Sequence, residues 1–487
     1  MLVETLPWPG GAGGLYARLG DRPGLVILDS GMEPRDPCRF PSGRWCFVAF
    51  KPFAVLECRP EGHRLLSRDT VQRFRGDPFD LLQEILEAHA LPAGPTPLPA
   101  GGIGFLSYGL RSFVEPLPAR PDDLDLPLAW ICFYDAVIAL DRQEEVLYLT
   151  STGIPARGPA RNRRAAARMR ELRDLVRSGG NAPSRPETVR AGGEGAVRSS
   201  FSRPDYLEAV YRVKEYIAAG DVYQVNLAQR FSVPWTGAPG ALFARLCRSN
   251  PAPFAALVSG PGFAVVSASP ERFLHLDPRS GLVHTRPIKG TRPRGATPAD
   301  DARLARELQA SAKDRAEHVM IVDLERNDLS RVAARASVQV SELLVLESFP
   351  TVWHLVSTVE AVLRPETGYA ALLRAVFPGG SITGAPKIRA MEIIEELEPV
   401  PRGLYTGAIG YFGFDGGLDL NIAIRTVVLQ GGRAWFHAGG GIVADSDPEA
   451  EYRETLDKAR ALFGVLGCKE GGAADAGLPE RTDGAGR

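Results

Sequence analysis

The sequence predicts an α+β fold built around a largely antiparallel β-sheet. Short apolar segments with the alternation typical of strands follow one another in runs, separated by Gly and Pro turns. Helical patterns lie among the strands of the second half but do not alternate with them one for one, which disfavours a doubly wound parallel sheet. A hydrophobic content of 44% provides the side chains for a proper core.

The expected elements can be placed in chain order. Before residue 179 the strand-like segments are GLVILDS, WCFVAF, PFAVLEC, AWICFYDAVIAL and EEVLYLT. After residue 200 they are AALVSG, FAVVSASP, LDLNIAIRTVVL and RAWFHAGG. Helical patterns predict helices over residues 204–218, 299–309, 312–324 and 448–466. The last helix has Asp447 as a natural N-cap and Pro448 in its first position.

Residues 179–200 divide the chain into two regions. This segment is rich in Gly, Pro, Ser and charge and has no periodic apolar pattern, which predicts a linker. We expect an N-terminal region over residues 1–178 and a catalytic region over residues 201–466. The last residues, 467–487, consist of Gly, Ala and charged residues and are expected to be disordered.

The composition excludes several classes of function. The 57 Lys and Arg residues nearly balance the 58 Asp and Glu residues, so the chain has no overall field to attract nucleic acid or an anionic membrane. No apolar run approaches the roughly 20 residues of a membrane helix, and the first residues lack a signal-peptide pattern. The six cysteines show no metal-ligand spacing. We therefore expect a soluble, cytoplasmic protein.

The helix expected over residues 312–324 carries an acidic stripe. Steps of three and four residues place Asp314 and Glu317 on the same face as Ile321 and Leu324. A solvated helix end is the alternative for an isolated acidic pair. Burying a carboxylate is costly unless a cation or a donor meets it, so a stripe shared with core residues points to a cation.

A second acidic stripe lies on the helix expected over residues 448–466. Glu451, Glu454 and Lys458 repeat at helical spacing and continue into apolar residues. Two pairs of carboxylates on separate helices are hard oxygen ligands, which suit Mg²⁺ shared with an anionic substrate. Zinc is disfavoured because no Cys lies nearby.

The segment FPGGSITGAPKIRAMEIIEELEP predicts a Gly-rich turn that leads into a helix. The free N–H groups and the positive dipole of such a helix start suit an anion. The turn is not a P-loop, since Ala385, Pro386 and Lys387 follow Gly384 where a P-loop has Lys and Ser or Thr. A carboxylate is as suitable a ligand as a phosphate.

LDLNIAIRTVVL predicts one strand. Alternation puts Leu418, Leu420, Ile422 and Ile424 on one face, opposite Asp419, Asn421, Ala423 and Arg425. Arg425 can then present its guanidinium fork to a carboxylate, although a solvated sheet face explains it equally well. In HAGGGIVADSDP, the run from Gly439 to Gly441 allows close approach of a ligand to the backbone, or forms a plain tight turn.

Lys289 lies in HTRPIKGTRPRG between Ile288 and Gly290. Desolvation of its ammonium group would lower its pKa and make a nucleophilic amine available. A lone lysine is usually solvated, so the spacing alone leaves both interpretations open.

Eight segments, in the same order, resemble those of the chorismate-utilising enzymes: SASPERFL, RPIKGTRPRG, AEHVMIVDLERNDLSR, SFPTVWHLVSTVEA, GSITGAPK, LYTGAIGYF, LNIAIRT and GGGIVADSDPEAEYRETLDKA. They cover roughly residues 200–466. The family comprises anthranilate synthases, aminodeoxychorismate synthases, and isochorismate and salicylate synthases. The resemblance implies a fold of two stacked antiparallel sheets with helices outside.

The resemblance also implies roles for particular residues. Glu317 and Glu454 match the magnesium ligands, supported by Asp314 and Glu451, and Glu271 matches the general acid or base. Tyr405 and Arg425 match positions that hold the enolpyruvyl carboxylate of chorismate. The other matched active-site positions are Thr383, His354, Lys458, Gly439, Gly440 and Gly441.

Two positions distinguish the branches of the family. The water-using synthases have a lysine base where this chain has Gln224, so the resemblance implies ammonia as the nucleophile. Lys289 replaces the alanine typical of anthranilate synthases and resembles the lysine of the branch that aminates chorismate at C4 through a covalent intermediate. The expected product is 4-amino-4-deoxychorismate, a precursor of 4-aminobenzoate and folate. Anthranilate synthesis is the alternative.

Two further expectations concern regulation and a partner. LVILDSG around Ser30 resembles the tryptophan-site segment of these enzymes, so a tryptophan pocket is expected in the N-terminal region. No segment resembles a glutamine amidotransferase, and none of the cysteines lies in a glycine-rich elbow. Ammonia is therefore expected from a separate glutaminase subunit that forms a heterodimer with this chain.

Overall fold

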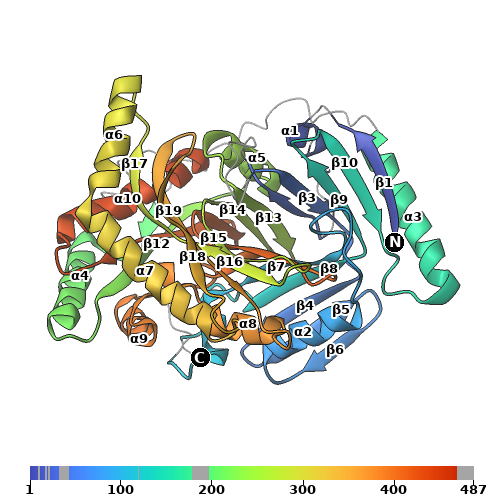
Figure 1. Ribbon diagram of the computed structural model, residues 1–487, viewed down its shortest axis with the longest axis horizontal. Helices are drawn as coiled ribbons and strands as arrows, with labels where there is room; N and C mark the ends of the chain where they lie inside the picture. The colour runs from blue at the N-terminus through green and yellow to red at the C-terminus, as the bar shows by residue number, and fades with distance from the viewer. Residues whose placement is uncertain are drawn as a thin grey trace.

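The computed structural model describes residues 1–8, 11–16, 19, 22, 24–31, 43–118, 120–177 and 197–468. Two twelve-stranded sheets form its framework, and every strand pairing in them is antiparallel. Figure 1 shows the sheets side by side with helices around them. The predicted α+β class with stacked antiparallel sheets is confirmed.

The first sheet has this spatial order: β1 (Leu2–Pro7), β10 (Val146–Ser151), β9 (Ala136–Asp141), β3 (Trp45–Ala49), β2 (Val26–Asp29), β13 (Phe254–Gly260), β14 (Phe263–Ser269), β23 (Thr426–Gln430), β24 (Arg433–Ile442), β12 (Gln224–Pro234) and β11 (Arg198–Ser199), with β20 (Gly384–Ala385) paired to β12. Strands from before residue 178 and after residue 200 therefore share one sheet.

The second sheet is also shared by the two halves of the chain. Its order is β17 (Ile288–Pro293), β19 (Val352–Val362), β16 (Leu282–Arg286), β15 (Arg272–Leu276), β22 (Leu418–Ile422), β21 (Ala408–Gly413), β7 (Gly101–Leu106), β8 (Ala129–Tyr134), β4 (Ala54–Arg59), β5 (Gly62–Ser67) and β6 (Val71–Phe74), with β18 (Gln339–Ser348) paired to β19. The boundaries proposed at residues 178 and 200 remain predictions.

Helices cover the outer faces of the sheets. They are α1 (Gly11–Tyr16), α2 (Pro78–Ala88), α3 (Gly158–Arg177), α4 (Arg203–Ala218), α5 (Pro239–Ser249), α6 (Pro298–Ala310), α7 (Ala312–Ser330), α8 (Tyr369–Val376), α9 (Lys387–Leu397) and α10 (Pro448–Leu466), with 3₁₀ turns η1 (Tyr108–Phe113) and η2 (Gly380–Ile382). One apolar core lies between the sheets, and others lie beneath the helices on each side.

The two helices with acidic stripes begin at side-chain caps. Ser311 accepts a hydrogen bond from the N–H of Asp314 at the start of α7, and Asp447 caps α10 in the same way. α10 has the bounds that the sequence predicts. α7 runs to Ser330, six residues beyond the predicted end, and the helix packs against β17, β18 and β19.

Four short connections carry the chain from one sheet to the other. They are residues 50–53, Asp135, residues 270–271 and residues 423–425. The prediction of one strand over LDLNIAIRTVVL is therefore wrong, because β22 and β23 belong to different sheets and Arg425 has a φ of 49°. AWICFYDAVIAL likewise contains two strands. A sheet crossing inside an apolar run leaves the hydrophobic pattern unbroken, so periodicity does not show it.

Some expectations fall outside the described residues. These are the predicted linker up to residue 196 and the predicted tail after residue 468. Arg198 and Ser199, at the end of the predicted linker, form β11. In the part of the chain that the structure describes, no helix is long and apolar enough to cross a membrane.

Candidate active site

Lys289 lies on β17 at the edge of the second sheet, where α7 packs against that strand. Its Nζ donates a hydrogen bond to the carbonyl oxygen of Ser381 at 2.9 Å. Burial lowers the pKa of Lys289, and Lys458 lowers it further, while the negative charge of Glu271 opposes the shift. Lys289 as a whole is half-buried, and its role as a nucleophilic amine stays a prediction.

Glu271 comes from the crossing between β14 and β15 and is buried. Its Oε1 faces the N–H of Ile288 at 3.5 Å, one residue before Lys289. Burial raises the pKa of Glu271, and the effects of Ser381 and Lys289 partly offset that rise. A carboxyl group with a raised pKa beside an amine is suited to donate and accept protons.

The carboxylates of α7 and α10 influence one another. Burial raises the pKa values of Glu317 and Glu451, and each also feels a neighbouring negative charge. Glu451 accepts a 2.6 Å hydrogen bond from Ser446. The pKa of Glu454 is lowered, chiefly by Lys458, whose Nζ lies 2.7 Å from its Oε1.

This arrangement has donors that suit a hard divalent cation. A cation between α7 and α10 would relieve the repulsion that burial imposes on Glu317 and Glu451. Asp314 is already engaged, because Arg292 donates to its Oδ2 at 3.1 Å. Within the described residues no three acidic, His or Cys side chains form a ready metal cage, so substrate oxygens would have to complete the coordination.

Arg425 is the last residue of the crossing between β22 and β23. Burial lowers the pKa of its guanidinium, and among the described residues no hydrogen bond or ion pair to its side chain is present. The positive charge of Arg425 and burial lower the pKa of His354 to about 3. His354 is held by Thr291, whose hydroxyl lies 2.9 Å from its Nδ1. A half-buried cation without a carboxylate partner among the described residues is suited to an anionic ligand.

Tyr405 and Thr383 are both buried, and each is held within the protein. The ring of Tyr405 stacks on that of His437 at 4.9 Å. The hydroxyl of Thr383 donates to the carbonyl of Gly379 at 3.0 Å within its own turn. The turn that contains Tyr405 contacts the crossing at Ala423, two residues before Arg425.

Gln224 and the glycine run face each other on β12 and β24. The Nε2 of Gln224 lies 2.0 Å from where a Cβ on Gly441 would be, so a larger residue at 441 would have to displace the Gln224 amide. The Oε1 of Gln224 is buried and has no hydrogen-bond partner within the described part of the chain. Gly440 lies beside Glu451, and Lys458 donates to the carbonyl of Gly439 at 2.8 Å.

Ser30 lies apart from these residues. It lines a cavity of about 280 Å³ between the two sheets, together with Asp29, Trp45, Phe254 and Tyr411. Neither Lys289 nor Arg425 lines that cavity. The charge of Lys289 is influenced by Glu271, Lys458, Glu317 and Glu454, whereas the predicted tryptophan residue lies at a separate cavity.

Sequence reasoning missed residues that lie near Lys289 and Glu271. Among them are Ser381, which accepts from Lys289, and Glu325, which accepts a hydrogen bond from Thr285 at 3.0 Å. Glu325 lies four residues after Ile321, so extending the α7 stripe by one turn would have found it. Nothing in the sequence pairs Ser381 with a lysine 92 residues away.

A model of the chorismate binding enzymes matches residues 41–464. The chain therefore belongs to the chorismate binding enzyme family. Aminodeoxychorismate synthase component 1 of Klebsiella aerogenes is 42% identical over 467 residues, which cover 95% of this chain and 98% of that relative. Anthranilate synthase component 1 of Thermus thermophilus is 43% identical over 415 residues, covering 84% and 85%.

A solved structure agrees with these relationships. Anthranilate synthase component I from Streptococcus pneumoniae superposes with a TM-score of 0.75 at 30% identity, covering 89% of this chain and 94% of that one. Relatives of both names match at similar identity, so overall similarity does not distinguish the two reactions.

Proposed function

We propose that this enzyme aminates chorismate at C4 with ammonia to give 4-amino-4-deoxychorismate. The observation that carries the proposal is the position of Lys289: its amine is desolvated, held by the Ser381 carbonyl, and adjacent to Glu271. An amine in this setting can act as a nucleophile, which an alanine at this position could not do.

The reaction takes place in two balanced steps. The Lys289 amine forms a bond to C2, the two ring double bonds shift, and the C4 hydroxyl leaves as water after accepting a proton from Glu271. Ammonia then bonds to C4, the double bonds shift back, and the C2–N bond breaks to release Lys289. The C2-bound nitrogen keeps both of its protons as an ammonium and leaves as the neutral Lys289 amine, and the proton that the new C4 ammonium loses restores the Glu271 carboxyl.

Other residues of the predicted site would bind and orient the substrate. Arg425 and Tyr405 would hold the enolpyruvyl carboxylate, because Arg425 is half-buried and has no carboxylate partner among the described residues. Gln224 has an amide where a base would be needed to activate water, which favours ammonia. His354, Thr383 and the backbone of residues 439–441 would shape the remaining wall.

We propose Mg²⁺ as the cofactor. Glu317 and Glu454 would hold it, with Asp314 and Glu451 in support. When bound, the ion would neutralise the ring carboxylate of chorismate and help the C4 oxygen to leave. Chelation of divalent metal is expected to abolish turnover, and added Mg²⁺ to restore it.

The ammonia would come from a glutaminase subunit that forms a heterodimer with this chain. The relatives named above are each called component 1, which supports a second component. We expect the complex to act in the cytoplasm and to supply 4-aminobenzoate and folate synthesis.

Anthranilate synthesis is the second candidate, since relatives of that name match equally well. Mass analysis of the product formed from chorismate, ammonium and Mg²⁺ distinguishes the two. The wild type is expected to release 4-amino-4-deoxychorismate, and Lys289→Ala to lose about 10³-fold or more of that activity. Anthranilate as the main product, or amination at C4 untouched in Lys289→Ala, would refute the proposal.

We also propose that the cavity at Ser30 binds tryptophan. Its aromatic walls suit an indole ring, and the buried Oγ of Ser30 has no hydrogen-bond partner among the residues that the structure describes. Isothermal titration with tryptophan is expected to give a saturable heat that Ser30→Ala reduces. Absence of any heat with the wild type would count against the pocket.

A further inference from the structure

A buried ion pair lies at the C-terminal end of α9. The guanidinium of Arg402 binds both carboxylate oxygens of Glu398, at 2.7 Å and 2.9 Å. Both side chains are almost fully buried. Replacing or misplacing one member of such a pair leaves an uncompensated charge, so its geometry is firmly held.

The other donors of Arg402 fasten three separate segments. Nη1 donates to the carbonyl of Ile382 at 3.0 Å and to the hydroxyl of Thr406 at 3.2 Å, and Nη2 donates to the carbonyl of Asn226 at 2.6 Å. With the two bonds to Glu398, these use all five N–H groups of a guanidinium. Arg402 therefore has no donor left for a ligand.

The segment at Ile382 is the one that holds Lys289. The carbonyl of Ile382 accepts from Arg402 and also from the side chain of Asn226, at 3.0 Å. The preceding carbonyl, that of Ser381, is left to accept from Lys289 at 2.9 Å. Because adjacent peptide planes share a Cα atom, fixing the Ile382 carbonyl also limits where the Ser381 carbonyl can point.

The same guanidinium also contacts the turn that contains Tyr405 and Thr406. The guanidinium carbon of Arg402 lies 5.6 Å from the centroid of the Tyr405 ring, and the same ring stacks on that of His437. Thr406, the next residue, binds both Arg402 and the crossing at Ala423. One buried cation thus sets the spacing between the Ser381 turn and the Tyr405 turn.

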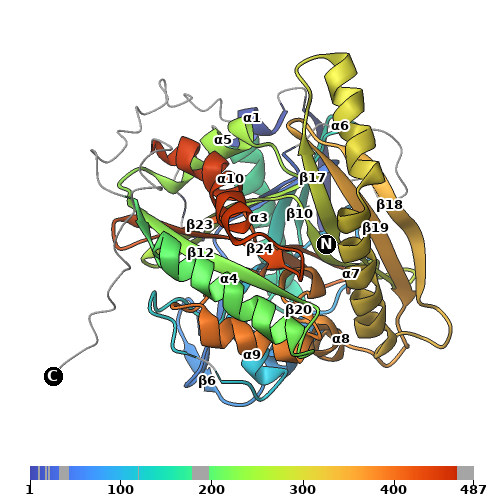
Figure 2. The same cartoon turned by 90° about the vertical axis from the view of Figure 1, so that its left-hand side faces the viewer.

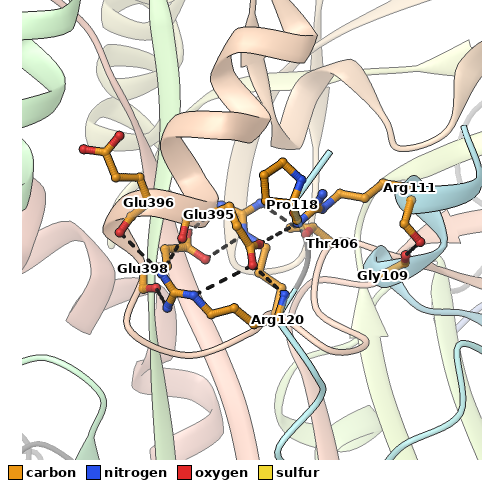
Figure 3. A network of polar contacts seen from close by, with 10 residues as sticks. Gly109, Arg111, Pro118, Arg120, Glu395, Glu396, Glu398 and Thr406 are labelled. Carbon is orange, nitrogen blue, oxygen red and sulfur yellow. Dashed lines mark hydrogen bonds and ion pairs between the residues drawn. The ribbon is translucent and has the colours of Figure 1, made fainter. Parts of the chain in front are cut away.

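A neighbouring ion pair offers a matched comparison. Arg111 binds Glu395 at 2.5 Å, and Arg120 donates to the carbonyl of Glu398 at 2.7 Å, so both arginines grip the same end of α9. Figure 3 shows these contacts around Glu395 and Glu398. Arg111 is as buried as Arg402, yet its hydrogen bonds go to Glu395 and Pro118 and none goes to the Ser381 turn.

We propose that Arg402, oriented by Glu398, is a positioning residue for Lys289. It fixes the turn from Ser381 to Thr383 so that the Ser381 carbonyl meets the Lys289 amine, and it holds the Tyr405 turn at the matching distance. The inference rests on the proposed role of Lys289.

The test compares Arg402→Lys with Arg111→Lys in the full chain. Chorismate consumption with ammonium and Mg²⁺ is followed whatever the product, and Tm is measured for each variant. Arg402→Lys is expected to lower kcat/KM about 100-fold and to move the acidic limb of its pH profile to higher pH, because a loosened turn admits water to Lys289. Arg111→Lys is expected to stay within threefold, with an unshifted profile.

The outcomes separate the possible failures. If the two variants lose activity in proportion to their loss of Tm, with unshifted profiles, Arg402 is merely structural and the inference is wrong. Should Arg402→Lys not fold, Asn226→Ala removes the other donor to Ile382 and leaves the ion pair intact. It is expected to lower kcat/KM about tenfold, and activity within twofold of wild type would overturn the inference. Wild-type release of anthranilate would refute the proposed function without touching this comparison.

Discussion

Both halves of the chain cross between the same two sheets, but the charged residues at their crossings differ in whether they have ion-pair partners. In the N-terminal half, Asp135 at one crossing is fully buried and lies 2.7 Å from Arg164 and 3.4 Å from Arg168, both on α3. Lys51 at the other crossing pairs with Glu171 of the same helix. Each N-terminal crossing charge is thus neutralised by the protein itself.

The charged residues at the C-terminal crossings have different surroundings. Among the described residues, Arg425 has no carboxylate partner, and Glu271 is buried with a raised pKa beside Lys289. Nothing in the architecture requires this, since α3 shows that the fold can supply partners. Arg425, which lacks a carboxylate partner among the described residues, is therefore the crossing charge best suited to an anionic ligand.

Removing the unpaired charge should have the largest effect. Arg425→Gln is expected to lower kcat/KM for chorismate by about 10³-fold, since a buried guanidinium that meets a carboxylate contributes several kcal/mol to binding. Stability should be unchanged or higher, because the variant no longer buries a lone cation. Steady-state kinetics and thermal unfolding measure both. A large loss of Tm with normal kcat/KM would break the comparison.

Removing a paired charge should do the reverse. Asp135→Asn is expected to destabilise the protein by about 3 kcal/mol, because Arg168 would remain buried without its full partner. The folded fraction should keep a normal kcat/KM for chorismate. Denaturant unfolding and activity assays of the same sample provide the check, and a selective loss of activity would show that the N-terminal crossing also serves the reaction.

A buried acid behind Glu271 gives a pH-dependent effect. Burial raises the pKa of Glu325 from 4.5 to about 8, aided by the charges of Glu271 and Asp328 and opposed by Lys387. Between those pH values the folded state binds a proton that the unfolded state has lost, so stability falls as pH rises. Glu325→Gln is expected to remove on the order of 2 kcal/mol of that fall. If the free energies of unfolding of wild type and variant changed in parallel from pH 5 to pH 8, this prediction would be wrong.

The smallest effect is expected at the exposed pair. Lys51→Ala should change stability by less than about 1 kcal/mol, since both Lys51 and Glu171 are solvent-accessible and Glu171 keeps its contact with Arg168. Activity should be unchanged. A loss as large as that of Asp135→Asn would mean that neutralisation at the N-terminal crossings does not depend on burial.

Much of the local structure could be predicted from the sequence. α10 begins at the predicted cap and ends before Gly467, whose φ of 77° suits the residue after a helix. The core face of β22 was correct, since Leu418, Leu420 and Ile422 are buried. These features depend on residues within a turn or two of one another, where spacing and propensity are decisive.

The break before Arg425 was not predictable in the same way. The apolar pattern continues across it because Ala423 and Ile424 pack in the interior on both sides of the crossing. Alternation therefore assigned Arg425 to the face of a strand. In the structure Arg425 lies between the two sheets and has a left-handed backbone conformation. The sequence alone likewise gave no sign that Arg402 would hold Ile382 and Asn226.

The sequence by itself determined the family, the acidic helices and the presence of Lys289, because motifs and helix periodicity are local properties of the chain. Tertiary structure alone decided which charges are neutralised. Lys51 finds Glu171 across 120 residues, and Lys289 finds the Ser381 carbonyl across 92. Whether a buried charge meets a partner depends on distances of a few ångströms between remote segments, since burial strengthens each pairing and raises the cost of leaving a charge unpaired.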